Sequence, residues 1–121
     1  KKIPVIVPMG IGKNNKIYNI NADVAAGSVA KNLKARRLLL MTDVEGVLDQ
    51  DQKLITEINS SVAKDMLEKK IISGGMIPKI KTCLDAVNKG VTGVVIVDGR
   101  KQHSILFEIF SDKGAGTLIR K

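Results

Sequence analysis

A lysine follows two glycines and a proline in the segment IISGGMIPKIK (residues 71–81). Pro78 suits the first turn of a helix, where its missing amide hydrogen leaves no bond unmade. Lys79 then stands where the helix dipole is positive, which disfavours a cation unless an anion neutralises it. The backbone amides around Gly74 and Gly75 can face the same anion. The segment predicts a phosphate site, or else a lysine that points to solvent at a cost of roughly 0.3 kcal/mol.

Two asparagines and an aspartate alternate in NINAD (residues 19–23). Asn19 and Asn21 project to the same side of an extended strand, and their amides can both donate to and accept from a carboxylate or amide ligand. Asp23 follows at an expected helix start, where a carboxylate is electrostatically favourable. The same pattern also describes an ordinary asparagine cap. The pattern alone leaves a ligand site and a cap equally open.

The segment TDVEGV (residues 42–47) ends the most apolar run of the chain. Thr42 and Asp43 have the polar groups to hydrogen-bond a ribose or a base, and Gly46 would let the backbone approach a ligand closely. A simple turn is the alternative. A P-loop is excluded because no Gly-x-x-x-x-Gly-Lys-Ser/Thr occurs, and the Gly10-x-Gly12 pair lacks the third glycine of a dinucleotide-binding motif.

The elements that would position these residues alternate along the chain. A first strand (3–7) turns back through a second (17–20), and the run 36–43 suits a central strand buried on both faces. A helix at 59–70 has Ser60 or Ser61 as its cap, and a helix at 103–110 has Ile105, Leu106, Ile109 and Phe110 on one face. The other expected elements are helices at 21–35 and 78–89 and strands at 91–99 and 116–121.

Alternating strands and helices predict an α/β fold, a three-layer αβα sandwich with a mainly parallel central sheet. In such sheets, ligands bind beyond the carboxyl ends of the strands. The loops after residues 20, 42, 72 and 98 are therefore the expected binding loops.

Twenty basic against twelve acidic residues give a net charge of +8, which favours anionic partners. The lysines are scattered, as on a solvated surface, and one tyrosine and two phenylalanines are too few for the stacking platforms of single-stranded nucleic-acid binders. We therefore expect no nucleic-acid partner. We expect no membrane partner either, because no apolar run approaches the roughly 20 residues of a membrane span.

The chain has one cysteine and one histidine. A single cysteine excludes an internal disulfide and a multi-cysteine zinc site. Cys83 shares a helical apolar face with Ile80, Leu84 and Val87, which favours a buried thiol over a nucleophile. His103 is expected to cap or pack near a helix start, so no metal site is predicted.

Four segments together resemble the acetylglutamate kinases of the amino acid kinase family: YNINADVAAG, LLLMTDVEGVLD, ISGGMIPK and DGRKQHSILFEIFSDKGAGT. They span nearly the whole chain, and NINAD beside SGGMIPK separates this sequence from aspartokinases, glutamate 5-kinases and UMP kinases. The resemblance implies the C-terminal portion of the amino acid kinase or carbamate kinase-like fold. It also implies ATP-dependent phosphorylation of the γ-carboxylate of N-acetyl-L-glutamate, a step of arginine biosynthesis.

The resemblance also implies roles for individual residues. Asn19 and Asn21 would bind acetylglutamate, Asp23 would organise the catalytic lysines, and Lys79 would neutralise charge on the transferred phosphoryl group. Mg²⁺ would accompany ATP and be held mainly by the nucleotide. The residues expected to line the nucleotide are Thr42, Asp43, Val44, Gly46, Val47, Leu48, Ile71, Ile72, Ser73, Gly74, Gly75 and Met76.

By the same resemblance, residues 1–121 form one domain, the ATP-binding C-terminal domain, and the N-terminal substrate domain is absent. The chain opens on Lys1 with no apolar leader behind it, so we expect no secretory signal and regard Lys1 as a candidate truncation point. Half the substrate site and one of two catalytic lysines would be missing. We expect these residues alone to bind nucleotide weakly and to turn over little. The implied location is the cytoplasm, or the plastid stroma in a photosynthetic eukaryote.

The segment HSILFEIFSDKGAGT resembles the part of arginine-inhibited, ring-forming hexameric members that binds the effector. Glu108 would take the cationic groups of L-arginine, with the backbone near Gly114. A packing helix followed by a turn is the alternative. Dimers or hexamers and a PII-type regulator are further partners implied by the family. Two other functions stay open, namely another amino acid kinase activity and a non-catalytic nucleotide- or effector-binding module.

Overall fold

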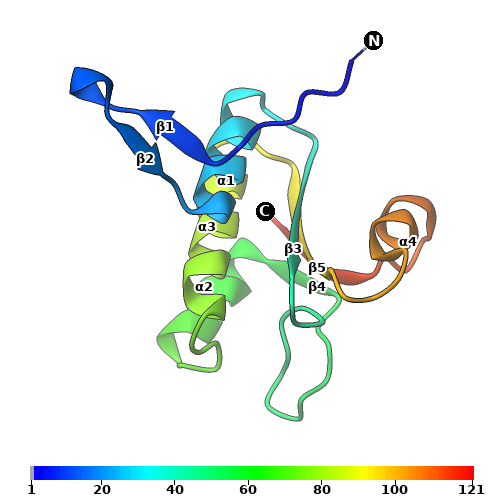
Figure 1. Cartoon of the computed structure of the whole chain (residues 1–121). Coiled ribbons are helices and arrows are strands. Elements are labelled where there is room, and N and C mark those ends of the chain that lie inside the picture. Colours follow the sequence, from blue (N-terminus) through cyan, green and yellow to red (C-terminus); the bar gives the residue numbers. More distant parts are fainter. Residues whose placement is uncertain (1) are drawn as a thin grey trace.

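The computed structural model describes residues 2–121 (Figure 1). It begins with a hairpin whose tip is a short 3₁₀ turn, and a larger α/β unit follows. The elements in chain order are β1 (Met9–Ile11), η1 (Lys13–Asn15), β2 (Ile17–Asn19), α1 (Ala22–Asn32), β3 (Arg37–Thr42), β4 (Glu57–Asn59), α2 (Ser60–Glu68), α3 (Met76–Asn88), β5 (Gly93–Asp98), α4 (Ser104–Phe110) and β6 (Gly116–Arg120).

In the described residues the main sheet has four strands in the order β3-β5-β6-β4. The pairs β3–β5 and β4–β6 are parallel, which confirms the mainly parallel sheet, whereas β5 and β6 are antiparallel. The reversal falls across residues 99–115, the connection that contains α4.

The helices lie on both faces of this sheet, as expected for a three-layer fold. Figure 1 shows α1, α2 and α3 together on one side and α4 on the other. Every residue of β5 is buried. Val94 and Ile96 belong to the core cluster with Ile80 and Val87 of α3, so Val95 and Val97, which alternate with them, face the α4 side.

Two expectations about strands are wrong. The run at 36–43 forms β3, but β3 pairs only with β5 within residues 2–121, and of its residues only Leu40 is buried. The central, fully buried strand is β5 instead. Residues 3–7 form no strand: their side chains are exposed, and the hairpin pairs Met9 with Asn19. Pro4 lies within this segment and Pro8 follows it directly, and neither has an amide hydrogen to donate to a strand pair.

Other local expectations also need correction. Asn59, not Ser60 or Ser61, caps α2, because its Oδ1 accepts from the amide of Val62 at 2.8 Å. The preceding strand β4 was not expected. The apolar face of α4 is exposed, with Leu106, Ile109 and Phe110 at 52%, 54% and 81%. Within the described residues, no helix combines the length and apolarity needed to cross a bilayer.

Candidate functional site

Lys79 of α3 and Asp23 of α1 form an ion pair, with 2.6 Å between Nζ and Oδ2. Both residues lie near the N-terminus of their helix, so each faces a positive dipole end. The side chains are 13% and 26% exposed, so Lys79 does not point freely to solvent. The unfavourable interaction of the Lys79 charge with the helix dipole is therefore neutralised by the Asp23 carboxylate of the same chain.

Close packing of α1 on α3 brings the two charges together. Gly27 lies one turn after Asp23, and a Cβ on it would stand only 3.0 Å from the Thr82 methyl group of α3. Cys83 lies one turn after Lys79 and is fully buried, as predicted. Burial raises the pKa of the Cys83 thiol to about 12, so it stays protonated and inert at neutral pH.

A cavity of about 540 Å³ opens beside this ion pair. It is lined by Lys79 together with the end of β3 and the start of α3, which are Thr42, Asp43, Val44, Ser73, Gly75 and Met76. The sheet and helix thus bring together two loops some thirty residues apart in the sequence. The cavity lies at the carboxyl end of β3, where ligands of open α/β sheets bind.

The glycines of the α3 loop are open to this side of the molecule. Gly74 has a φ of +56°, a conformation that favours glycine, and a Cβ on Gly74 or Gly75 would meet no atom within 4 Å. The helix begins at Met76, two residues earlier than predicted, and Pro78 is its third residue. The Met76 and Ile77 amides donate to the Ser73 and Gly74 carbonyls at 3.3 and 3.2 Å, and Pro78 has no amide hydrogen. The amides left to face an anion at this helix start are those of Gly74 and Gly75.

Other residues expected at the nucleotide do not line this cavity. Val47 and Ile72 are core residues, at 2% and 4% exposure. Leu48 forms an isolated bridge with Leu54, and Ile71 packs against the core. Gly46 is buried beneath the loop, against Thr117. These residues pack beneath the two loops and do not line the cavity.

Asn19 and Asn21 lie at the approach to α1. The Asn21 Oδ1 accepts from the Val24 amide at 3.2 Å and caps α1, so the capping alternative is observed. Asn19 is an exposed residue of β2 opposite Met9. Only one residue separates Asn21 from Asp23, so the cap and the ion pair share one end of α1.

An acidic residue missed in the sequence ends the central strand. Asp98 is 2% exposed and accepts from the Arg100 guanidinium through both oxygens, each at 3.0 Å. These hydrogen bonds lower the pKa of Asp98 to about 2. The following loop contacts the loop after β3: the Gly99 amide donates to the Thr42 carbonyl at 2.8 Å, and Lys101 pairs with Glu45 at 2.7 Å. The loop after residue 98 was an expected binding loop, but no pattern in its sequence marked Asp98 and Arg100 as an ion pair.

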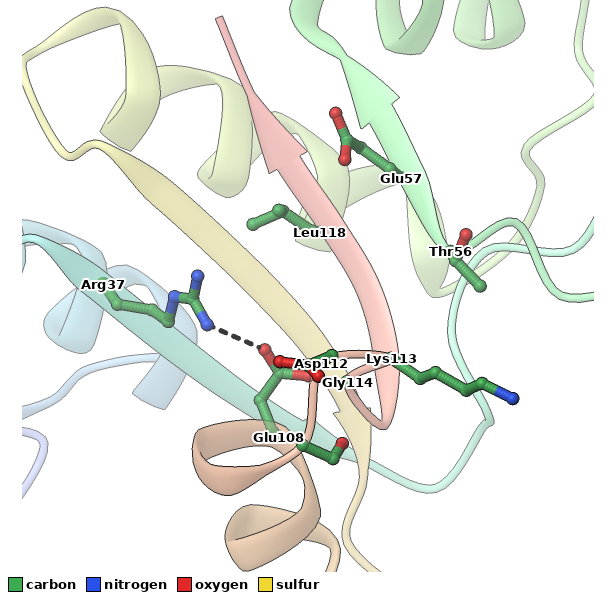
Figure 2. A pocket seen from close by; sticks show the side chains of 10 residues that line it. Arg37, Thr56, Glu57, Glu108, Asp112, Lys113, Gly114 and Leu118 are labelled. Carbon is green, nitrogen blue, oxygen red and sulfur yellow. Dashed lines mark hydrogen bonds and ion pairs between the residues drawn. The ribbon is translucent and has the colours of Figure 1, made fainter.

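A second cavity, of about 470 Å³, lies where α4 meets the strands (Figure 2). Glu108 is 7% exposed; its Oε1 accepts from Arg37 at 3.1 Å and its Oε2 accepts from the Ala115 amide at 2.9 Å. Gly114 has a φ of +67°, and a Cβ there would stand 2.8 Å from the Glu108 carboxylate. The structure thus brings Glu108 and Gly114 together. Arg37, read only as a strand start, was missed because its partner is 71 residues away.

Within residues 2–121, no group of three or more histidine, cysteine, aspartate or glutamate side chains is arranged to hold a metal ion. Asp43 is the one carboxylate lining the cavity beside Lys79, and Asp23 is engaged with the lysine. This donor set suits a cation that arrives bound to phosphate rather than one held in a protein cage.

The sequence profile of the amino acid kinase family matches residues 1–98, which cover both helices of the ion pair and the cavity beside it. The chain belongs to the amino acid kinase family. It is 62% identical over 120 residues to the acetylglutamate kinase of Pelagibacter ubique strain HTCC1062, which confirms the resemblance seen in the motifs. That match covers 99% of this chain and 42% of the relative, so the chain spans less than half the length of that kinase.

Solved structures agree with the family assignment. The N-acetylglutamate synthase of Neisseria gonorrhoeae, complexed with coenzyme A and L-arginine, matches with a TM-score of 0.87 at 30% identity, over 94% of this chain and 26% of that one. The carbamate kinase of Giardia lamblia bound to AMP-PNP matches with a TM-score of 0.69 at 21% identity, over 91% and 36%. The second likeness supports the amino acid kinase fold alone.

Proposed function

We propose that this chain supplies the nucleotide-binding half of an acetylglutamate kinase, which transfers the γ-phosphoryl group of ATP to the γ-carboxylate of N-acetyl-L-glutamate. The observation that carries the proposal is the Lys79–Asp23 ion pair beside a cavity walled by the Thr42–Val44 and Ser73–Met76 loops. The 62% identity to a kinase of that name supports this choice of substrate over other family reactions.

The chemistry of phosphoryl transfer suits such a site. The reaction asks mainly for positioning and for stabilisation of charge on the transferred group. Lys79 would supply a cation, and the Gly74 and Gly75 amides just before α3 would supply hydrogen bonds to phosphate oxygens. The substrate carboxylate is itself the nucleophile, so the reaction needs neither a thiolate at Cys83 nor a catalytic base.

Asp23 would hold the Lys79 ammonium in place between turnovers. Since it accepts a hydrogen bond at 2.6 Å, it limits the positions that this flexible side chain can occupy. Asn19 and Asn21, at the same end of α1, would offer amides to acetylglutamate. Mg²⁺ would neutralise charge on the phosphates when bound, and we propose that it arrives with the nucleotide.

The remaining parts of the active site would come from outside this chain. The chain spans 42% of the Pelagibacter kinase, and we propose that it corresponds to the ATP-binding C-terminal domain of a longer enzyme. An N-terminal domain would then supply a second lysine and the rest of the substrate site. Cytoplasmic location, assembly into dimers or hexamers and control by a PII-type protein are further proposals from the family.

The cavity around Glu108 is the best candidate for an effector site. A nearly buried carboxylate beside the Gly114 backbone offers acceptors to a guanidinium or an ammonium group. L-Arginine carries both groups, and it is present in the complex of the structurally similar synthase. We propose that L-arginine binds here and inhibits the kinase.

One experiment tests the central proposal. In a chimera, these 121 residues replace the matching 120-residue segment of the Pelagibacter kinase. We expect ADP release that depends on N-acetyl-L-glutamate and not on aspartate, glutamate or UMP. Release with one of those other acceptors, or tight ATP binding without turnover, would contradict the proposal.

A further inference from the structure

A buried hydroxyl group holds the loop that follows β3. Thr117 of β6 is fully buried, and its Oγ1 accepts from the Val47 amide at 2.8 Å and donates to the Ile55 carbonyl at 2.6 Å. A threonine hydroxyl has one hydrogen to donate and can also accept, so both capacities are used. The two partners lie at opposite ends of one excursion of the chain, whose base is also closed by a hydrogen bond from the Ile55 amide to the Val47 carbonyl at 2.9 Å. The Thr117 hydroxyl fastens both ends of this closed loop to β6.

Gly46 fits against the same hydroxyl. Its φ is +149°, and a Cβ there would stand 2.5 Å from the Thr117 Oγ1 and 2.7 Å from the Leu54 side chain. Only glycine allows the loop to rest this closely on β6. Gly46 therefore belongs to the contact between loop and sheet and not to a ligand surface.

The loop held in this way carries the wall of the first cavity. Asp43 and Val44 line the cavity and are exposed residues, three to four positions before Val47. Other ties of this part of the loop include the hydrogen bond from the Gly99 amide to the Thr42 carbonyl and the exposed one from the Thr42 hydroxyl to Asp43. The ion pair of Lys101 with Glu45 is a third, and its side chains are about half exposed. Exposed ion pairs hold geometry weakly. Thr117 is thus the buried polar anchor of this wall.

We propose that Thr117 is a positioning residue for the nucleotide: its hydroxyl sets the place of residues 43–48 without touching the ligand. This inference rests on the proposed nucleotide cavity. It goes beyond that proposal because it assigns a role to a residue of β6, remote from the cavity lining and from Lys79. The backbone of Thr117 pairs with Ile96 of β5, so the sheet does not need the hydroxyl.

Kinetics in the chimera separate positioning from general stability. Thr117→Val keeps the shape and removes the hydroxyl, whereas Thr117→Ser keeps the hydroxyl. We expect Thr117→Val to raise the KM for ATP about tenfold, with kcat and the KM for N-acetyl-L-glutamate changed less than threefold. Thr117→Ser should restore the KM for ATP to within threefold of the parent. The matched control is Thr92→Val, an exposed threonine just before β5, which should change neither constant.

An unchanged KM for ATP in Thr117→Val would overturn the inference, and so would an equal loss for both substrates or a failure of Thr117→Ser to restore it. Amide hydrogen exchange in the 121-residue chain tests the anchor without any activity. Exchange at Val47 should accelerate at least tenfold in Thr117→Val and stay near the parent rate in Thr117→Ser. Unchanged exchange at Val47 would contradict the inference, whether or not the chimera is active. An inactive chimera, by contrast, would count against the proposed function.

Discussion

The Lys79 ammonium and the Asp23 carboxylate are 56 positions apart in the sequence and 2.6 Å apart in the structure. Each comes from near the N-terminus of a helix, and the two helices approach closely because Gly27 carries no side chain to meet Thr82. The pair keeps a cation where a helix dipole would otherwise disfavour it. A bound phosphoryl group would share that cation with Asp23. The ion pair would thus hold Lys79 in place without a ligand and leave it able to contact a phosphoryl group during the reaction.

Replacement of Lys79 should affect turnover far more than nucleotide binding. In the chimera we expect Lys79→Ala to lower kcat by about 10²–10³-fold. The Kd for ATP should rise less than tenfold, because the substitution leaves the proposed contacts of the Gly74 and Gly75 amides with phosphate in place. Initial rates and nucleotide titration measure the two effects. Lys81→Ala is the matched control, an exposed lysine of the same helix. Equal losses in rate and affinity would assign Lys79 to binding only.

The 121-residue chain by itself should turn over very little. We expect acetylglutamate-dependent ADP release at least about 10²-fold below that of the chimera, because the transition state would lack donors from the remaining domain. A coupled assay at matched concentrations checks this. Rates comparable to the chimera would show that the described residues already complete the site.

Glu108 should govern the response to L-arginine. Glu108→Gln keeps the shape of the side chain and removes the charge that would attract a cationic ligand. We expect the concentration for half-inhibition of the chimera to rise at least tenfold, with little change in the uninhibited rate. Glu68→Gln, at the exposed end of α2, is the control. Unchanged inhibition in Glu108→Gln would remove this carboxylate from the effector site.

The free energy of unfolding should decrease at acid pH, and part of that decrease should depend on Arg100. The Arg100 guanidinium lowers the pKa of Asp98 from its ordinary value of 3.8 to about 2. A depressed carboxyl pKa contributes stability that is fully present above 3.8 and is lost as pH falls toward 2. Urea unfolding of the 121-residue chain should therefore show the parent more stable than Arg100→Gln at pH 6, with the difference shrinking below pH 4. A difference that does not vary with pH would refute this assignment.

Several parts of the fold and site could be predicted from local pattern. The alternation of apolar runs placed the helices and most strands of the main sheet, and the rule that ligands bind at carboxyl ends of strands pointed to the loops after residues 42 and 72. Both loops line the first cavity with Lys79. The burial of Cys83 followed from helical spacing.

Other predictions were wrong where burial depends on residues that are distant in the sequence but close in the structure. The apolar face of α4 seemed to be its buried face, yet Ser104 and Glu108 are the residues buried against the rest of the molecule. Glu108 tolerates burial because Arg37 and the Ala115 amide satisfy its oxygens. Nothing in the helix itself reveals those partners. The same reason explains β3, whose apolar run suggested a centre but whose place in the strand order is an edge.

By itself, the sequence determined most of the order of elements and the placing of Lys79 just behind a glycine loop, because periodicity, capping and turn chemistry act over a few residues. The family followed from the resemblance of four motifs. The tertiary structure alone decided which charges meet. Lys79 with Asp23 and Arg37 with Glu108 each join residues more than fifty positions apart. The hydrogen bond between Thr117 and Val47 also joins residues that are far apart in the sequence. Such contacts depend on how closely helices pack and on which strand lies beside which, and neither is encoded in any short segment.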